Sequence, residues 1–161
     1  MRAECNKEKD MYTNGQIVLL KNAAQTKEEI IRLLSEELYQ KGYVTSDFAT
    51  AVLSRETVYP TGLDINGLGV AIPHTDADKV QSPQLAFATL KEPVAFQNMV
   101  DISQTINVSM VFLLAIKKSD EQVFMLQKLI EIFQNQELMD QLQKVEQEKE
   151  FIRIIRQAGI Q

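Results

Sequence analysis

The sequence predicts an α/β fold in which helices are layered on a β-sheet. Strand-like and helix-like segments alternate along the chain, an order typical of such a fold. The 161 residues fit one domain, and 45% of them are apolar, so the chain can bury a substantial core. Residues 1–14 are polar and lack an apolar period. We expect them to form a flexible extension before a single domain over residues 15–161.

The first half of this domain is expected to contain a strand, two helices and a long loop. Thr26 and Glu29 have the spacing of a capping box, apolar residues then recur with helical period, and Gly42 provides the stop. Ser46 is the expected N-cap of the second helix. Pro60 and three glycines then predict a turn-rich loop. The expected ranges are a strand at 16–20, helices at 26–42 and 46–56, and a loop at 57–69.

The second half is expected to contain four strands and three helices. Residues 84–90 alternate as a half-buried strand does, and 92–96 reads as an edge segment with a proline. Residues 105–116 end in an apolar run that suits a strand covered on both faces. The remaining ranges are a strand at 70–72 and helices at 119–136, 136–147 and 148–159, the first with Val123, Leu126, Leu129, Ile130 and Phe133 on one face.

The composition argues against several classes of function. A net charge of −5 is unlike that of a general nucleic-acid binder, and no apolar run reaches the ~18–20 residues of a membrane helix. One histidine and one cysteine cannot supply an ordinary zinc site, and neither a phosphate-binding glycine loop nor G-x-S-x-G is present. We therefore expect no cofactor, no nucleic-acid partner and no membrane insertion. A single cysteine, which allows no internal disulfide, favours a cytoplasmic protein.

His74, the only histidine, directly follows a short strand and Pro73. Proline ends the strand and places the imidazole near loops, where reacting groups tend to lie. Asp76 and Asp78 are close enough to orient the ring, and a Mg²⁺ or Ca²⁺ site there stays open, although no loop glycine pattern supports one. A histidine in a surface turn is the plain alternative. A lone imidazole can also attack phosphorus, a role that needs a cation, best an arginine, to bind the phosphate.

The segment around His74 resembles a known family. Arg55-Glu56, Thr61-Gly62 and AIPH at 71–74 have the spacing of the active-site segment in enzyme IIA components of the bacterial phosphoenolpyruvate:sugar phosphotransferase system, mannitol–fructose class. Residues 109–133 look like the family's strand and following helix, and the likeness spans residues 15–158. The runs PTGL and AIPHTD look closest to the galactitol-type branch. The resemblance implies a mixed β-sheet flanked by helices on both faces.

The resemblance also implies a phosphocarrier with two protein partners. His74 would accept a phosphoryl group from the phosphocarrier HPr and pass it to a cysteine of the cognate enzyme IIB, which serves the membrane component IIC. Arg55 would bind the phosphate, although an arginine at a helix end is favourable without any ligand. Gln122 stands where many mannitol-class members have a second histidine. Its amide could donate to a phosphoryl oxygen, or Gln122 could complete a capping box with Ser119.

Residues next to His74 have smaller expected roles. Thr75 stands where the wider class has a small residue, and a turn-forming role suits it best. Asp76 and Asp78 would repel a phosphate, so we expect them to be turned away or solvated. Thr61 and Gly62 should shape the loop that covers the site. A shallow apolar patch around the histidine should allow two partners to dock in turn.

Two other functions compete with the phosphocarrier. The first is a regulatory relative of similar fold that binds and controls a partner according to its phosphorylation state. The second is an interaction module that is insensitive to phosphate, in which His74 is a relic. Cys5 has no preceding strand and no phosphate-binding loop, so it is interpreted as a bystander. We expect a component without a fused B or C segment.

Overall fold

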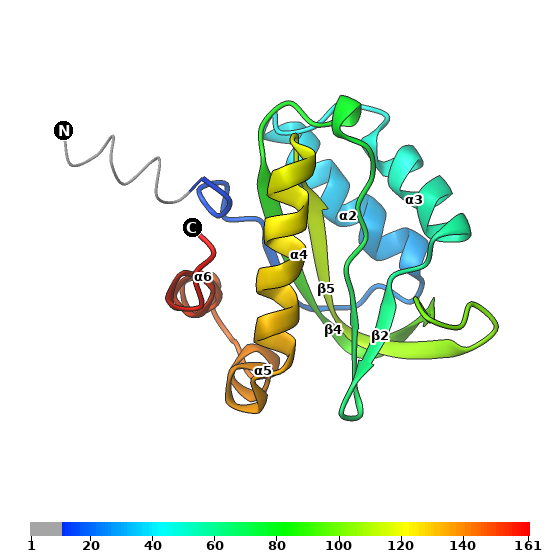
Figure 1. The fold of residues 1–161 in the computed structure, drawn as a ribbon, viewed down its shortest axis with the longest axis vertical. Helices are drawn as coiled ribbons and strands as arrows, with labels where there is room; N and C mark the ends of the chain where they lie inside the picture. Colours follow the sequence, from blue (N-terminus) through cyan, green and yellow to red (C-terminus); the bar gives the residue numbers. More distant parts are fainter. Residues whose placement is uncertain (1–10) are drawn as a thin grey trace.

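The computed structural model describes residues 11–161; Cys5 and the rest of residues 1–10 lie outside the described part. Within these residues, five strands form one sheet, and five helices and a short 3₁₀ turn surround it (Figure 1). The strands are β1 (Val18–Asn22), β2 (Gly62–Ile65), β3 (Leu68–Ala71), β4 (Gln84–Gln97) and β5 (Thr105–Ala115). The helices are α2 (Lys27–Gln40), α3 (Phe48–Val58), α4 (Ser119–Phe133), α5 (Gln136–Gln143) and α6 (Glu148–Gln157), with the 3₁₀ turn η1 at Ala77–Lys79.

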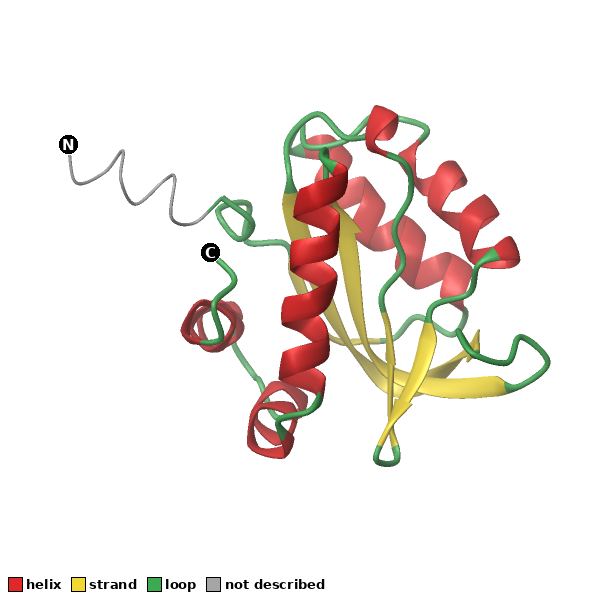
Figure 2. Ribbon diagram, in the orientation of Figure 1, coloured by secondary structure: helices red, strands yellow, loops and turns green. Residues whose placement is uncertain are grey.

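The sheet has the strand order β1-β4-β5-β3-β2 and is mixed, as the resemblance implied. Figure 2 shows its strands in yellow with the helices in red around them. β4 pairs with β5 and β2 pairs with β3 in antiparallel fashion, whereas the β1–β4 and β3–β5 pairs are parallel. β5 therefore lies in the middle of the sheet, with two strands on each side. This position explains why its C-terminal half is buried on both faces.

Helices cover both faces of the sheet, which confirms the predicted fold class. Since successive strand residues point to opposite faces, each central strand contributes to two separate cores. Phe87 and Phe112 belong to the core under α4, α5 and α6, whereas Ala88 and Leu113 belong to the core under α2 and α3. Phe87 stacks on Phe151 with ring centroids 4.1 Å apart, which fixes α6 to the sheet. None of the described helices is long and apolar enough to cross a membrane.

The signals that predicted α2 act as expected. The Thr26 hydroxyl oxygen accepts a hydrogen bond from the Glu29 N–H at 3.1 Å, and the Glu29 carboxylate accepts one from the Gln25 N–H at 3.0 Å. Gly42, just past the helix, has φ of 84°, which a residue with a side chain rarely adopts. The helix is therefore fixed at both ends by its own sequence.

The predicted cap of α3 is wrong. The helix begins at Phe48 with Asp47 as its N-cap, one residue later than the expected Ser46, and the cap makes no side-chain hydrogen bond to the helix. The Asp47 carboxylate instead accepts hydrogen bonds from the Thr45 hydroxyl at 2.5 Å and the Lys79 ammonium at 2.7 Å. Asp47 thus joins the start of α3 to η1.

The long loop predicted at 57–69 is also wrong. α3 continues to Val58, and residues 62–71 form the β2–β3 hairpin. Its tip has the two positive φ angles of a type I′ turn, 53° at Asn66 and 91° at Gly67. The Gly67 N–H also donates to the Asp64 carboxylate at 2.8 Å. Four-residue strands carry too little periodicity to be separated from a loop rich in glycine.

Two further predictions need correction. The expected strands at 84–90 and 92–96 form one strand, β4, whose pairing with β5 shifts between Thr89 and Val94, around Pro93. On α4, Leu129 and Phe133 are buried as expected, but Val123 and Ile130 are exposed. The helix carries two apolar stripes, and the one centred on Met125, Leu129 and Ile132 faces the sheet.

The segment 11–14, which the sequence assigned to the extension, packs against the domain. Tyr12 is buried; its N–H donates to the Gln161 carbonyl at 2.9 Å, and its carbonyl accepts from the Leu85 N–H at 2.8 Å. The side chain of Gln84, fully buried, accepts a hydrogen bond from the Gly15 N–H at 2.9 Å. The two ends of the described chain therefore meet beside β4.

Candidate functional site

His74 lies just beyond the end of β3 and beside the central strand β5. The Leu114 N–H donates to the Pro73 carbonyl at 3.0 Å, and His74 pairs with Leu114 in the parallel sense. Pro73 itself has no N–H and interrupts β3, as predicted. The half-buried histidine is thus held at a strand end by the buried C-terminal half of the central strand.

One nitrogen of the imidazole is engaged and the other is free for chemistry. Nδ1 of His74 lies 2.8 Å from the carbonyl oxygen of Ile72. Because a carbonyl oxygen only accepts, Nδ1 must carry the proton in this contact, and in a neutral ring Nε2 then keeps its lone pair. The choice between the two nitrogens could not be predicted from the sequence. The backbone at residue 72 makes the choice.

The surroundings also keep the imidazole neutral. Burial lowers the pKa of His74 below its ordinary value of 6.5, and the positive charge of Arg55 lowers it further. The hydrogen bond to Ile72 and the charge of Asp76 oppose this lowering of the pKa. At neutral pH the ring is therefore uncharged, with its one proton on Nδ1 and a lone pair on Nε2.

Arg55 lies in the last turn of α3 and lines the same pocket as His74. Its Nη1 is 3.7 Å from a carboxylate oxygen of Asp76, and its guanidinium carbon lies 5.3 Å from the centroid of the Tyr59 ring. Its Nε is buried without a hydrogen-bond partner. The guanidinium is therefore oriented by a weak ion pair and an aromatic face, and its side chain is 36% exposed, so part of it can be reached from solvent. The structure brings Arg55 and His74 together as predicted.

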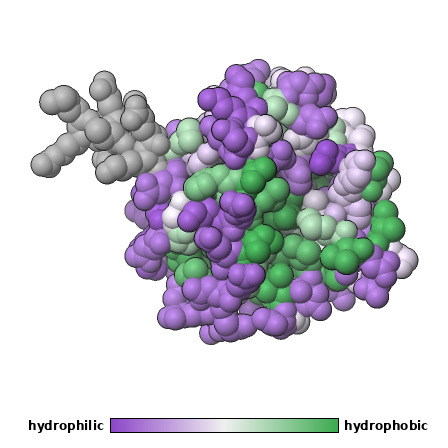
Figure 3. All heavy atoms as spheres, in the orientation of Figure 1, coloured by the Kyte–Doolittle hydropathy of each residue, from purple (hydrophilic) through white to green (hydrophobic). Residues whose placement is uncertain are grey.

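The pocket around His74 has a volume of about 420 Å³ and an apolar rim. Its polar lining is Arg55, Thr61 and His74. The rim comes from the end of α3 and from the loop between β4 and β5, and Val100 in that loop is 87% exposed. Apolar surface is visible beside α4 and toward the β4–β5 loop in Figure 3. The exposed rim residues are Val58, Tyr59, Met99, Val100 and Ile102.

The loop from α3 to β2 is fixed by a buried carboxylate. Glu56 is only 2% exposed, and its two oxygens accept hydrogen bonds from the N–H and the hydroxyl of Thr61, both at 2.8 Å. Burial raises the pKa of Glu56, while the two hydrogen bonds from Thr61 lower it. Thr61 shapes the loop, as expected. At Gly62, an added Cβ would lie 2.6 Å from the Gln97 carbonyl oxygen, so the close approach of Gly62 to the end of β4 requires a residue without a side chain.

Gln122 lies in the first turn of α4, and the residues that line the His74 pocket do not include it. Its alternative role is wrong: α4 begins at Ser119 with Lys118 as the N-cap, and this cap makes no side-chain hydrogen bond to the helix. The expected capping box is therefore not formed. Contact between Gln122 and a phosphoryl group stays a prediction.

The residues after His74 leave the pocket. Thr75 is buried, and Asp76 and Asp78 are exposed to solvent, as expected. Asp76 is not turned away from the site, however, because it reaches Arg55. Asp78 lies 3.9 Å from the Lys79 ammonium. Within residues 11–161 no three histidine, cysteine or acidic side chains gather in a way that could hold a metal ion.

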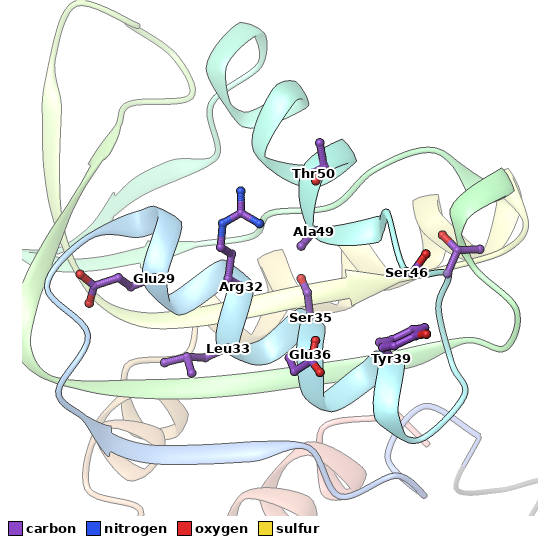
Figure 4. A pocket seen from close by; sticks show the side chains of 10 residues that line it. Glu29, Arg32, Leu33, Ser35, Glu36, Tyr39, Ser46, Ala49 and Thr50 are labelled. Atoms are coloured by element: carbon purple, nitrogen blue, oxygen red, sulfur yellow. The ribbon is translucent and has the colours of Figure 1, made fainter.

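A larger hollow of about 600 Å³ lies elsewhere, between α2 and α3 (Figure 4). Arg32, Ser35 and Tyr39 line it from α2, and Ala49 and Thr50 line it from α3. Its lining contains no histidine. It adjoins the first turn of α3, whereas Arg55 stands in the last turn, so the two hollows are separate.

Comparison with known proteins identifies the family. The model of the family "Phosphoenolpyruvate-dependent sugar phosphotransferase system, EIIA 2" matches residues 11–158. The chain belongs to this family. It is therefore a phosphotransferase component, as the resemblance around His74 predicted, and the fold described above is that of mannitol-type EIIA proteins.

Relatives of this EIIA chain include a regulator, a transport component and a solved complex. Transcriptional regulator ManR of Bacillus subtilis (strain 168) is 36% identical over 109 residues, which are 68% of this chain and 15% of that protein. The PTS system galactitol-specific EIIA component of Escherichia coli (strain K12) is 26% identical over 116 residues, 72% of this chain and 77% of that protein. A complex of enzyme IIAMtl and phosphorylated enzyme IIBMtl from Escherichia coli matches with a TM-score of 0.71 and 25% identity, covering 88% of this chain and 95% of that one.

Proposed function

We propose that this EIIA chain carries a phosphoryl group on Nε2 of His74, taken from phospho-HPr and passed to a cysteine of a cognate enzyme IIB. The observation that carries the proposal is the 2.8 Å contact from Nδ1 of His74 to the Ile72 carbonyl, with Arg55 in the same pocket. This contact fixes the proton on one nitrogen and directs the lone pair of the other toward an incoming phosphorus atom.

The transfer is a displacement at phosphorus between two side chains. The Nε2 lone pair forms the new N–P bond while the N–P bond of the donor breaks, and the electron pair of that bond returns to the donor imidazole. The His74 ring becomes cationic in this step, and its Nδ1–H then makes a charge-assisted hydrogen bond to Ile72. Arg55 balances the charge of the phosphoryl oxygens as they cross the pocket.

The apolar rim is the proposed docking surface for both partners. With one histidine in the whole chain, donor and acceptor must reach the same atom and therefore bind in turn. Exposed rim residues such as Tyr59 and Val100 offer apolar contact without a deep cavity. Such an interface is small and releases its partner readily.

The proposed transport substrate is a sugar or polyol of the galactitol type. The galactitol-specific EIIA component of Escherichia coli matches this chain over 77% of its own length. The runs around Pro60 and His74 resemble the same branch. The membrane component IIC selects the substrate. We place the phosphoryl exchange on His74 in the cytoplasm, as a step before IIB and IIC.

A regulatory role is the second candidate, because ManR is the more similar of the two relatives, at 36% against 26% identity. In that role phosphorylation of His74 would change the binding of a partner protein, and no transfer to a IIB would be needed. The carrier and the regulator share the phosphorylation step and differ in the next one.

Phosphorylation is tested with radiolabelled phosphoenolpyruvate, enzyme I and HPr, on wild type and His74→Gln. We expect acid-labile, base-stable label on wild type and none on the variant. A wild-type protein that stays unlabelled while HPr is labelled contradicts the proposal. Imidazole ¹⁵N and phosphorus spectra of the labelled protein then identify the nitrogen, which we expect to be Nε2.

The second step separates carrier from regulator. Phosphorylated protein is mixed with the purified IIB of the galactitol-type branch, and label on its cysteine is followed over time. Rapid transfer supports the carrier. Label that stays on His74, together with a change in partner binding, supports the regulator.

A further inference from the structure

Glu56 is a buried acidic residue to which the transfer step gives no direct task. A buried carboxylate is costly unless its oxygens are satisfied, and here both accept hydrogen bonds from the same residue, Thr61. Glu56 also directly follows Arg55 at the end of α3. The carboxylate thus fastens the segment that enters the pocket to the helix turn that carries the phosphate-binding arginine.

From Thr61 the contacts continue to the imidazole. The Thr61 carbonyl accepts a hydrogen bond from the Ile72 N–H at 3.4 Å, and the Ile72 carbonyl is the group that engages Nδ1 of His74 at 2.8 Å. Glu56 is therefore connected to both side chains of the candidate site. It lies next to Arg55 in the same helix, and hydrogen bonds through Thr61 and Ile72 link it to His74.

We propose that Glu56 is a positioning residue that holds Arg55 and the Nδ1-protonated form of His74 in register across the pocket. It acts by fixing Thr61, and it does not touch the phosphoryl group. The proposal rests on the phosphocarrier function above and adds a residue for which neither the sequence nor the family assignment gave a role.

Thr61 offers Glu56 two donors, and this dictates the test variants. Glu56→Ala removes both acceptors and leaves the buried Thr61 N–H without a partner. Glu56→Gln has one acceptor oxygen for the Thr61 N–H, and its amide can donate to the Thr61 hydroxyl, which also accepts. The glutamine variant therefore preserves both hydrogen bonds to Thr61 with an uncharged side chain and serves as the conservative rescue.

Two measurements test the proposal: the tautomer of His74 and the rate at which it is phosphorylated. Because His74 is the only histidine, imidazole ¹⁵N spectra of the unphosphorylated protein report its tautomer without overlap. We expect Glu56→Ala to lose the pure Nδ1–H form, and Glu56→Gln to keep it. In single-turnover phosphorylation by phospho-HPr, we expect Glu56→Ala to be slower by on the order of tenfold to a hundredfold, with KM for HPr nearly unchanged. Glu56→Gln should stay within about fivefold of wild type.

Thr61→Val keeps the experiment decisive if Glu56→Ala does not fold. It is nearly isosteric, keeps the Thr61 N–H contact and removes only the hydroxyl contact, so we expect a smaller shift of both readouts in the same direction. Thr61→Ser keeps the hydroxyl contact to Glu56, so its imidazole ¹⁵N spectrum should show the same tautomer as wild type.

A folded Glu56→Ala protein with the wild-type tautomer and rate overturns the proposal. The tautomer is measured without any phosphoryl donor, so this result is distinct from failure of the carrier function. If wild type is never labelled but Glu56→Ala still changes the tautomer, the positioning role of Glu56 is supported and the carrier function is contradicted.

Discussion

Two of the hollows on the described part of the molecule differ in a way that size does not predict. The groove between α2 and α3 holds about 600 Å³ and the pocket at His74 about 420 Å³. Each contains one arginine, Arg32 in the groove and Arg55 in the pocket. The groove is lined by two consecutive helices and their connection, whereas the pocket draws on the end of α3, the residues after β3 and the β4–β5 loop.

The difference lies in how each polar group is held. In the pocket, an oriented imidazole, an arginine that is partly exposed to solvent and a threonine fixed to a buried carboxylate meet in one place. In the groove, Ser35 Oγ is buried without a hydrogen-bond partner, and no side chain there is a strong nucleophile at neutral pH. The candidate site is thus distinguished from the groove by orientation and chemistry more than by volume.

The largest expected effect is a difference in phosphorylation rate between alanine substitutions of the two arginines. We expect Arg55→Ala to slow phosphorylation of His74 by on the order of a hundredfold to a thousandfold, because the charge on the phosphoryl oxygens loses its donor. The binding of HPr should change little. Single-turnover labelling measures the rate, and titration with unphosphorylated HPr measures the binding.

Arg32→Ala is the matched control for that experiment, since it removes a guanidinium from the groove. It should phosphorylate at the wild-type rate. Equal losses in both variants would mean that the overall charge of the protein, and no specific site, governs the reaction.

A smaller effect should separate the two apolar surfaces. We expect Val100→Asp to raise KM for HPr about tenfold, equivalent to roughly 1.4 kcal/mol of docking energy, with little change in the rate at saturation. Val100 is 87% exposed, so the substitution should leave the fold intact. Leu33→Asp makes the same change in the groove, at a residue that is 45% exposed, and should leave KM unaltered. A raised KM in that control would place the docking surface on α2.

The smallest effect concerns the burial of His74. The folded protein holds this imidazole neutral with a pKa below 6.5, whereas the unfolded chain protonates it near 6.5. Protons are therefore taken up on unfolding between these two values, and the contribution of His74 to stability is full above 6.5 and lost as the pH falls. Urea unfolding from pH 7.5 downward should show a steeper decline for wild type than for His74→Gln. Parallel curves would mean that the ring is not desolvated.

Elements with strong local signals could be predicted from the sequence. The N-cap, the apolar periodicity and the terminating glycine of α2 all lie within or next to the helix, so α2 could be predicted without knowledge of tertiary contacts. The β2–β3 hairpin was missed because its strands have four residues each, although Asn66-Gly67 is a hairpin signal in its own right. The buried side of α4 depends on which of two apolar stripes meets the sheet, and that is decided by tertiary packing.

The site was predictable only in part, for the same reason. His74 and Arg55 were found through the spacing of a motif, and the structure brings them into one pocket. Val100 and its neighbours could not be assigned to the rim, because exposed and buried apolar residues look alike in a sequence. Glu56 belongs to the motif, but no role could be predicted for it from the sequence, because its hydrogen bonds with Thr61 form only in the folded chain.

The hydrogen bond between Tyr12 and Gln161 has a practical consequence for engineering. The two segments that it joins lie across the molecule from α3, and therefore from the rim proposed to dock the partners (Figure 1). A short linker could connect them while new termini open at the Asn66-Gly67 turn, giving a circular permutant with the same sheet. A surface tether attached at Gln161 would likewise leave the proposed phosphoryl-exchange face pointing into solution.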